Sequence, residues 1–191
     1  MLRINKQQIK DLANSIWLEY ASLQAILKTE TPGYGFDMAT GKLLIQFEPN
    51  YFKRMEPFAP SGAWSVNKVD VQSKEWVAFN DAFSKDPESA MKSTSIGMPQ
   101  IMGENFKACG YNSVGEMWDE FKKGEYHQVK ALCNFILSNK KLYQAIKECN
   151  WHQVAYIYNG PKYKEMAIKW GRDPYDITLA KEYAIAQKEK I

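Results

Sequence analysis

The feature that most constrains this chain is a long amphipathic pattern near its N-terminus that ends on a carboxylate. Apolar residues recur there at the spacing of one helical face, namely Ile9, Leu12, Ala13, Ile16, Tyr20, Leu23 and Leu27. Asn5 can cap the start, so we expect one helix over about 6–29. The next position on the apolar face is Glu30, after which Thr31-Pro32-Gly33 forbids further helix, because proline lacks an N–H and restricts the residue before it.

The position of Glu30 at the edge of an apolar stripe suggests a chemical role. A glutamate there would be half desolvated, and desolvation raises the pKa of a carboxyl group, as a general acid at neutral pH requires. Most glutamates in proteins are exposed, so this position alone also fits a solvated side chain at a frayed helix end. Other segments of the sequence must decide between these interpretations.

Length, charge and cysteine usage exclude several classes of protein. The chain has 191 residues, 45% of them hydrophobic, which indicates one globular domain. Its net charge of +3, without a run of basic residues, does not indicate nucleic-acid binding. The N-terminus lacks an apolar core for a signal peptide, and no apolar run is long enough to span a membrane. The 3 Cys and 2 His show no metal-ligand spacing, so we expect no disulfide framework, metal or cofactor.

The remaining patterns predict a mainly α fold with a small β element. A β-like run covers 42–47, and 56–70, which is rich in Pro, Gly and Ser, is expected to be a loop. Ser113 and Glu116 form a capping box, and Pro174 suits the first position of the last helix. Helical patterns cover 73–92, 125–138, 142–146, 151–158 and about 174–188.

Four short segments carry residues suited to chemistry, and their order is informative. They are Thr29-Glu30-Thr31-Pro32-Gly33-Tyr34-Gly35-Phe36, Leu44-Ile45-Gln46-Phe47-Glu48, the block from Ser95 to Asn105, and Tyr158-Asn159-Gly160-Pro161. In this order they resemble the N-acetylmuramidase family of phage endolysins, within the lysozyme and lytic transglycosylase superfamily. The resemblance covers about 8–186 and is most specific over 95–111. Ile96 and Pro99 depart from the family pattern, so the wall of the cleft is expected to differ. Asn50 stands where the family usually has His after Phe-Glu, so the surroundings of Glu48 are expected to differ too.

The resemblance implies a lysozyme-like α+β fold, as a single domain over 1–191 with no separate wall-binding domain. It implies hydrolysis of the β-1,4 bond between N-acetylmuramic acid and N-acetylglucosamine in peptidoglycan, with Glu30 as the general acid. Glu48 is the candidate second carboxylate, and Asp37 is a weaker alternative. The resemblance also implies the residues that bind the sugar, which are Ser95, Gly97, Gln100, Tyr158 and Asn159.

Two other functions remain open on the sequence. One is lytic transglycosylation of the same bond, in which the muramyl hydroxyl attacks internally and no water is needed. The other is a non-catalytic module that grips wall glycan or another protein through aromatic side chains. For an endolysin of this kind we expect a monomer that partners with peptidoglycan glycan strands, binds no nucleic acid and does not insert stably into membranes. We expect it in the host bacterial cytoplasm until it is released to the wall.

Overall fold

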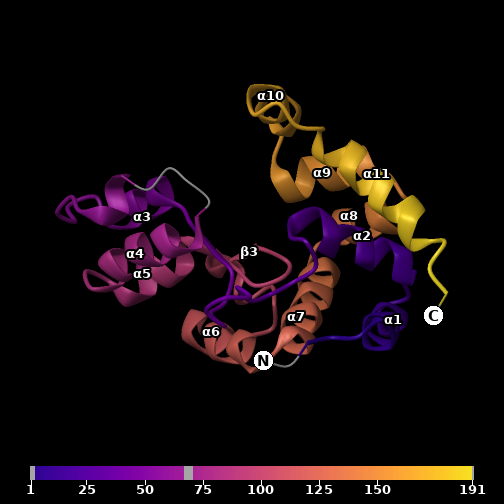
Figure 1. Cartoon of the computed structure of the whole chain (residues 1–191), viewed down its shortest axis with the longest axis horizontal. Coiled ribbons are helices and arrows are strands. Elements are labelled where there is room, and N and C mark those ends of the chain that lie inside the picture. Colours follow the sequence, from indigo (N-terminus) through magenta and orange to yellow (C-terminus); the bar gives the residue numbers. More distant parts are fainter. Residues whose placement is uncertain (1–2, 67–70, 191) are drawn as a thin grey trace. The chain divides into compact units, whose positions relative to one another are not determined.

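The computed structural model describes residues 3–66 and 71–190 (Figure 1). Among these residues, eleven α-helices accompany one three-stranded sheet, which confirms the predicted mainly α fold with a small β element. None of the described helices is long and apolar enough to cross a membrane.

The chain divides into two compact units. The first, which we call the sheet unit, contains Arg3 and Tyr34–Leu132 and carries the three strands. The second, which we call the helical unit, contains Ile4–Gly33 and 133–190. Helix α7 (Glu125–Ser138), whose bounds match the prediction, begins in the sheet unit and ends in the helical unit.

The N-terminal segment forms two helices, α1 (Lys6–Ser15) and α2 (Tyr20–Glu30), so the prediction of one continuous helix is wrong. Its two ends are predicted correctly. Asn5 caps α1 by accepting a hydrogen bond from the backbone N–H of Gln8 at 2.9 Å. At the other end, α2 stops at Glu30, where the proline that follows forbids another turn.

The break between α1 and α2 is a helix-terminating turn centred on Trp17. This residue has a left-handed φ of +59°, and its side chain is 83% exposed. The N–H of Trp17 donates to the carbonyl of Asn14, and the N–H of Leu18 donates to the carbonyl of Ala13, both at 3.0 Å. This pair of hydrogen bonds is the Schellman motif, which glycine usually supplies, so the sequence carries no ordinary signal for it.

Two helices of the helical unit, α1 and α11, pack against α2. Helix α11 packs along α2 and also contacts α9 (Figure 1). Their bounds are α8 (Lys140–Lys147), α9 (Trp151–Asn159), α10 (Tyr163–Lys169) and α11 (Tyr175–Ala186). The predictions for α8, α9 and α11 are confirmed within a few residues, except that Pro174 is the N-cap of α11 and not its first residue. The short helix α10 was not predicted.

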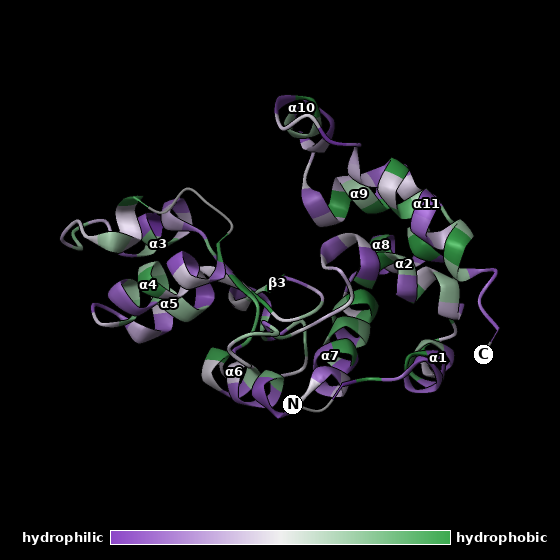
Figure 2. Cartoon of the chain, in the orientation of Figure 1, coloured by the Kyte–Doolittle hydropathy of each residue, from purple (hydrophilic) through white to green (hydrophobic). Residues whose placement is uncertain are grey.

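Apolar side chains fill the interior of the helical unit. Figure 2 shows both hydrophobic and hydrophilic residues along α11, of which Leu179 and Ala186 are buried. Fully buried residues of this unit include Leu23, Ile26, Leu27, Ile136 and Leu142. Burying side chains of this size stabilises the fold by about 1.5–3 kcal/mol each. This packing leaves Glu30, at the end of α2, next to an apolar interior.

The sheet is antiparallel, with the order β1-β2-β3. Its strands are β1 (Ile45–Phe47), β2 (Thr94–Ile96) and β3 (Ile101–Met102). Gln46 lies opposite Ser95, which lies opposite Met102, so these three residues form one row across one face. The β-like run predicted over 42–47 is confirmed for its second half.

Short helices complete the sheet unit. They are α3 (Pro49–Met55), α4 (Gln72–Phe83), α5 (Pro87–Lys92) and α6 (Val114–Lys123), with 3-10 turns η1 (Ala63–Val66) and η2 (Gly103–Asn105). The helix predicted over 73–92 is therefore two helices, because Asp86 caps α5 and Pro87 begins it. The loop predicted over 56–70 contains η1, and its last four positions, 67–70, lie outside the described residues.

Helix α4 supplies the hydrogen bonds that the free edge of β1 lacks. The Gln72 amide accepts from the Ile45 N–H at 3.0 Å and donates to the Ile45 carbonyl at 2.8 Å. The buried Glu75 carboxylate accepts from the Phe47 N–H at 2.9 Å. These side chains satisfy backbone groups that would otherwise be buried without partners, which fixes the strand leading into Glu48.

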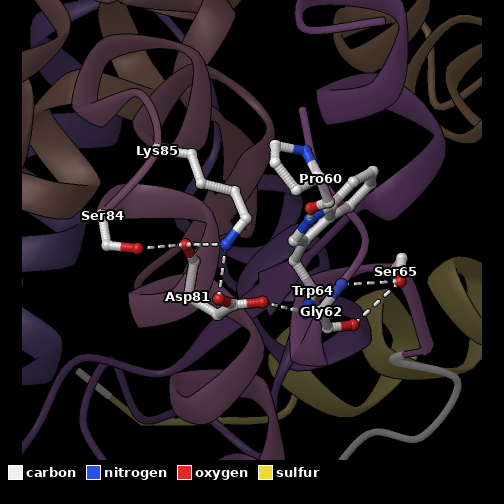
Figure 3. Close-up of polar contacts among 7 residues, drawn as sticks. All are labelled: Pro60, Gly62, Trp64, Ser65, Asp81, Ser84 and Lys85. Atoms are coloured by element: carbon white, nitrogen blue, oxygen red, sulfur yellow. Dashed lines mark hydrogen bonds and ion pairs between the residues drawn. The ribbon is translucent and has the colours of Figure 1, made fainter. Parts of the chain in front are cut away.

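A polar cluster attaches the loop before η1 to helix α4 (Figure 3). The Asp81 carboxylate accepts from the Trp64 N–H at 3.0 Å and pairs with Lys85 at 2.6 Å. The hydrogen bond from Lys85 is the largest cause of a lowered pKa at Asp81. Gly62 lies so close that an added Cβ would be 2.3 Å from the Asp81 carboxylate. A side chain at position 62 would therefore have to displace the Asp81 carboxylate, which holds the Trp64 N–H.

Candidate active site

Glu30 is the last residue of α2, and the backbone turns away directly after it. Thr31 is extended, with φ of −143°, although its N–H still donates to the Leu27 carbonyl at 3.2 Å. Gly33 has a left-handed φ of +91°, and its N–H donates to the Thr31 hydroxyl at 3.3 Å. The predicted stop after Glu30 is confirmed, and it places a carboxyl group at a helix terminus.

The environment of the Glu30 carboxyl favours its protonated form. Burial raises the pKa of Glu30 from 4.5 to about 7. A hydrogen bond from the Tyr175 hydroxyl and the positive charge of Arg172 both oppose this rise, but burial is the larger effect. The residue as a whole keeps intermediate exposure. Glu30 can therefore hold a proton at neutral pH.

Tyr175 is the direct polar partner of Glu30, and it belongs to an aromatic cluster. Its ring stacks on that of Tyr158, with centroids 6.2 Å apart and planes inclined by 17°. Phe135 meets Tyr158 edge-on at 5.9 Å. Burial and the neighbouring Glu30 raise the pKa of Tyr175 well above its usual value. The predicted residues Glu30 and Tyr158 thus lie in one cluster, joined by Tyr175.

The predicted sugar-binding residues of the 95–100 block lie in the sheet unit. Ser95 is at the centre of β2, opposite Gln46. Gly97 has φ of +70°, and its N–H donates to the Leu44 carbonyl at 2.8 Å. Gln100 also has a left-handed φ, +47°, and its amide donates to the Gly97 carbonyl at 2.8 Å. The three residues therefore occupy one strand and the tight turn that follows it.

The two carboxylates considered as a second catalytic group differ in their surroundings. Glu48 follows β1 and begins α3, with intermediate exposure. Its carboxylate accepts from the Gln46 amide at 3.2 Å. Asp37 is held by its own turn, accepting from the Thr40 hydroxyl and N–H at 2.7 Å each. The Thr40 hydroxyl is the largest cause of a lowered pKa at Asp37. Asp37 therefore stabilises a turn, whereas Glu48 lies beside Gln46, at the exposed end of the row formed by Gln46, Ser95 and Met102.

The structure divides the predicted site residues between the two units. Glu30, Tyr158 and Asn159 belong to the helical unit, where Asn159 is exposed at the end of α9. The others, Glu48, Ser95, Gly97 and Gln100, belong to the sheet unit.

Helix α7 contributes two buried polar residues that the sequence analysis missed. The Gln128 side chain accepts from the Met98 N–H at 2.8 Å and donates to the Phe121 carbonyl at 3.0 Å. Glu125 accepts from the Gly35 N–H at 3.0 Å. Both are almost fully buried, and their positions on the apolar face of the predicted helix over 125–138 were the available signal. Together they hold the turns that begin at Gly35 and Gly97.

Tyr175 is the other residue that the sequence analysis missed. It follows the predicted start of the last helix, and no motif marks it. Among the described residues, no group of three potential metal ligands comes together. In the helical unit, the Glu30 carboxyl group beside the Tyr175 and Tyr158 rings can perform proton transfer.

Comparisons with known proteins point to one family. A family model described as Muramidase, N-acetylmuramidase, matches residues 19–187. Among solved structures, the chain is similar to the endolysin of Burkholderia phage AP3, with 25% sequence identity and a TM-score of 0.80. That likeness covers 97% of this chain and 71% of the endolysin, and it confirms the predicted lysozyme-like endolysin fold. No curated protein matches this chain.

Proposed function

Since the chain belongs to the N-acetylmuramidase family, we propose that it cleaves the β-1,4 bond between N-acetylmuramic acid and N-acetylglucosamine, with Glu30 as the general acid. The family and the likeness to a phage endolysin make the protein a peptidoglycan-cleaving enzyme. The observation that carries the assignment of the acid is the carboxyl of Glu30, whose pKa burial raises to about 7.

The first step of the proposed reaction is proton transfer to the leaving group. Glu30 gives its proton to the glycosidic oxygen as the bond to the anomeric carbon breaks, and an oxocarbenium-like transition state forms. An acid with a pKa near 7 is protonated in about half of the molecules at neutral pH, yet it is strong enough to release the proton. An exposed glutamate would be almost fully ionised at that pH and could not act in this way.

Glu48 is our candidate for the second group, which stabilises the developing cation or orients a water molecule. Its carboxylate is partly exposed, and the Gln46 amide orients one of its oxygens. Asp37 suits this role less well, because its carboxylate is already used by the turn that it closes.

The remaining predicted residues are proposed to bind the sugar. Ser95 and Gln100 supply neutral donors and acceptors, which suit the hydroxyl and N-acetyl groups of an uncharged glycan. Gly97 is buried, and its missing side chain leaves room for Gln128 and Phe121, so we propose that it shapes the turn that presents Gln100 to the sugar. In the helical unit, Tyr158 supplies a partly exposed aromatic side chain and Asn159 an exposed amide.

The biological setting follows from the same proposal. We propose that residues 19–187 form a catalytic domain that acts on the bacterial cell wall as a monomer. We propose that it waits in the host cytoplasm until the inner membrane is opened.

The decisive experiment replaces the proposed acid. Glu30→Gln keeps the shape of the side chain but cannot deliver a proton, so lysis of permeabilised cells should fall by about 10²–10⁴-fold. Glu19→Gln is the matched control, because Glu19 is the N-cap of α2, the helix that ends at Glu30, and its carboxylate also accepts a hydrogen bond from a tyrosine of α11. Undiminished lysis by the folded Glu30→Gln variant would end the assignment.

Product analysis separates the proposed reaction from its alternatives. Hydrolysis leaves a reducing end on the muramic acid, whereas lytic transglycosylation leaves an anhydro end, and mass spectrometry distinguishes the two. Glu48→Gln should abolish hydrolysis but leave transglycosylation intact, because the internal attack needs no water. Binding to purified wall without release of any fragment would instead identify a non-catalytic glycan-binding module.

A further inference from the structure

The hydrogen bond between Tyr175 and Glu30 carries information beyond the identity of the acid. The Tyr175 hydroxyl donates to one carboxyl oxygen of Glu30, Oε1. A carboxylic acid carries a single proton, and an oxygen that accepts this hydrogen bond is the natural carbonyl oxygen of the protonated group. The acidic proton of Glu30 is then left on the other oxygen, Oε2.

We propose that Tyr175 is the positioning residue of the acid: it holds Oε1, so that Oε2 delivers the proton, and it stabilises the carboxylate that remains. This inference rests on the proposed function, in which Glu30 is the general acid. Tyr175 acts through Glu30 and is not assigned any contact with the substrate.

The charge that develops on Glu30 during proton transfer explains why the hydrogen bond from Tyr175 speeds the reaction. The O–H bond of Oε2 breaks, an O–H bond to the leaving oxygen forms, and the electron pair of the broken bond stays on the Glu30 carboxylate. As negative charge develops there, the hydrogen bond from Tyr175 becomes charge-assisted and stronger. An interaction that strengthens in the transition state lowers the barrier, whereas one of constant strength does not.

Tyr175 itself keeps its proton throughout. Burial and the adjacent Glu30 raise its pKa well above the usual value, so the phenol does not ionise at any pH at which lysis would be measured. It is therefore a donor to both the acid and the carboxylate forms of Glu30. The stacked ring of Tyr158 limits the directions in which the Tyr175 ring can turn.

The position of Tyr175 is fixed by the residue that follows it. Asp176 accepts from the Tyr163 hydroxyl at 2.9 Å and pairs with Lys164 at 3.4 Å. The same Tyr163 hydroxyl lies 2.6 Å from His152 Nδ1. These contacts connect the first turn of α11 to α10 and α9, so the Tyr175 hydroxyl is held against Glu30 by three helices.

The chain offers a matched control for testing this proposal. Tyr183 is also on α11, and its hydroxyl donates to the Glu19 carboxylate at 2.7 Å. Tyr175→Phe and Tyr183→Phe therefore each remove one tyrosine–carboxylate hydrogen bond from the same helix, but Tyr175→Phe alone affects Glu30. Two quantities are measured in both variants: the titration of the Glu30 carboxyl by NMR of carbon-13-labelled glutamate, and the pH profile of lysis. The Glu30 signal is assigned by its absence in Glu30→Gln.

In Tyr175→Phe we expect the titration midpoint of Glu30 to move upward by about one pH unit. The alkaline limb, which is the pH range in which the rate of lysis falls as the pH rises, should move upward by the same amount. We expect the maximal rate to fall about tenfold, and Tyr183→Phe to change neither titration nor rate. An unchanged Glu30 titration in folded Tyr175→Phe overturns the positioning role and leaves the proposed acid standing. A titration that moves while the limb stays in place shows instead that Glu30 is not the acid.

A second replacement keeps the test valid if Tyr175→Phe does not fold. Difluorotyrosine at Tyr175 has nearly the same shape as tyrosine, but its hydroxyl is more acidic and is a stronger hydrogen-bond donor. We expect it to move the Glu30 titration and the alkaline limb downward, opposite to the phenylalanine variant. A shift in the same direction as Tyr175→Phe, or none, overturns the proposal.

Discussion

Glu30→Gln should make the protein more stable at alkaline pH while it destroys activity. Burial raises the pKa of Glu30 from 4.5 to about 7, so the folded protein holds this proton more tightly than the unfolded chain. The free energy of unfolding therefore falls as the pH rises from about 4.5 to about 7, and it stays lowered above that range. Each pH unit in this window is worth about 1.4 kcal/mol, which sums to about 3.5 kcal/mol. Partial exposure of the residue reduces the expected value to about 2–3 kcal/mol.

Glutamine at position 30 removes the cost of burying an ionised carboxylate, because it does not ionise. Its carbonyl oxygen can still accept the hydrogen bond from Tyr175. Any difference in packing between the two side chains adds an offset that does not depend on pH. Urea denaturation, followed by tryptophan fluorescence from pH 4 to pH 9, measures the free energy of unfolding of both proteins. The variant should gain about 2–3 kcal/mol relative to the wild type between pH 4 and pH 8.

Glu19→Gln serves as the control here too, since this exposed glutamate also accepts from a tyrosine of α11. It should not gain stability as the pH rises. A difference between Glu30→Gln and the wild type that stays constant across the whole pH range would refute the reasoning, because it would mean that ionised Glu30 costs the folded protein nothing.

Three further predictions concern the pH profile and the packing of the sheet unit. The rate of lysis by the wild type should begin to fall near pH 7, as Glu30 loses its proton, and should then decline about tenfold per pH unit. A pH-rate profile in which the decline begins near pH 5 would contradict this. Gln128→Leu should lower the free energy of unfolding by about 2–5 kcal/mol in urea denaturation, because it leaves the buried Met98 N–H and Phe121 carbonyl without their partner. Gly62→Ala should cost about 1–3 kcal/mol in the same assay, because its Cβ would push the Asp81 carboxylate away from Trp64. For Gly62→Ala the control is Gly115→Ala in α6, where the nearest atom to the added Cβ is 3.8 Å away and stability should hold or rise.

Local sequence rules predicted the ends of elements better than their continuity. The stop after Glu30, the caps at Asn5 and Ser113, and the bounds of α7 follow from proline, capping side chains and apolar spacing, which act within a few residues. The break at Trp17 was missed because tryptophan rarely adopts the left-handed conformation, so no local preference announces it.

Of the candidate site, the sequence by itself determined which carboxyl group ends the helix, and the motifs around it indicated the family. It also determined that the residue after Glu30 cannot continue the helix, because proline imposes this in any context. The tertiary structure alone decided that Tyr175, 145 positions away along the chain, donates to that carboxyl group. It also decided how far the pKa of Glu30 rises, because desolvation depends on which atoms surround a group and not on its neighbours in sequence.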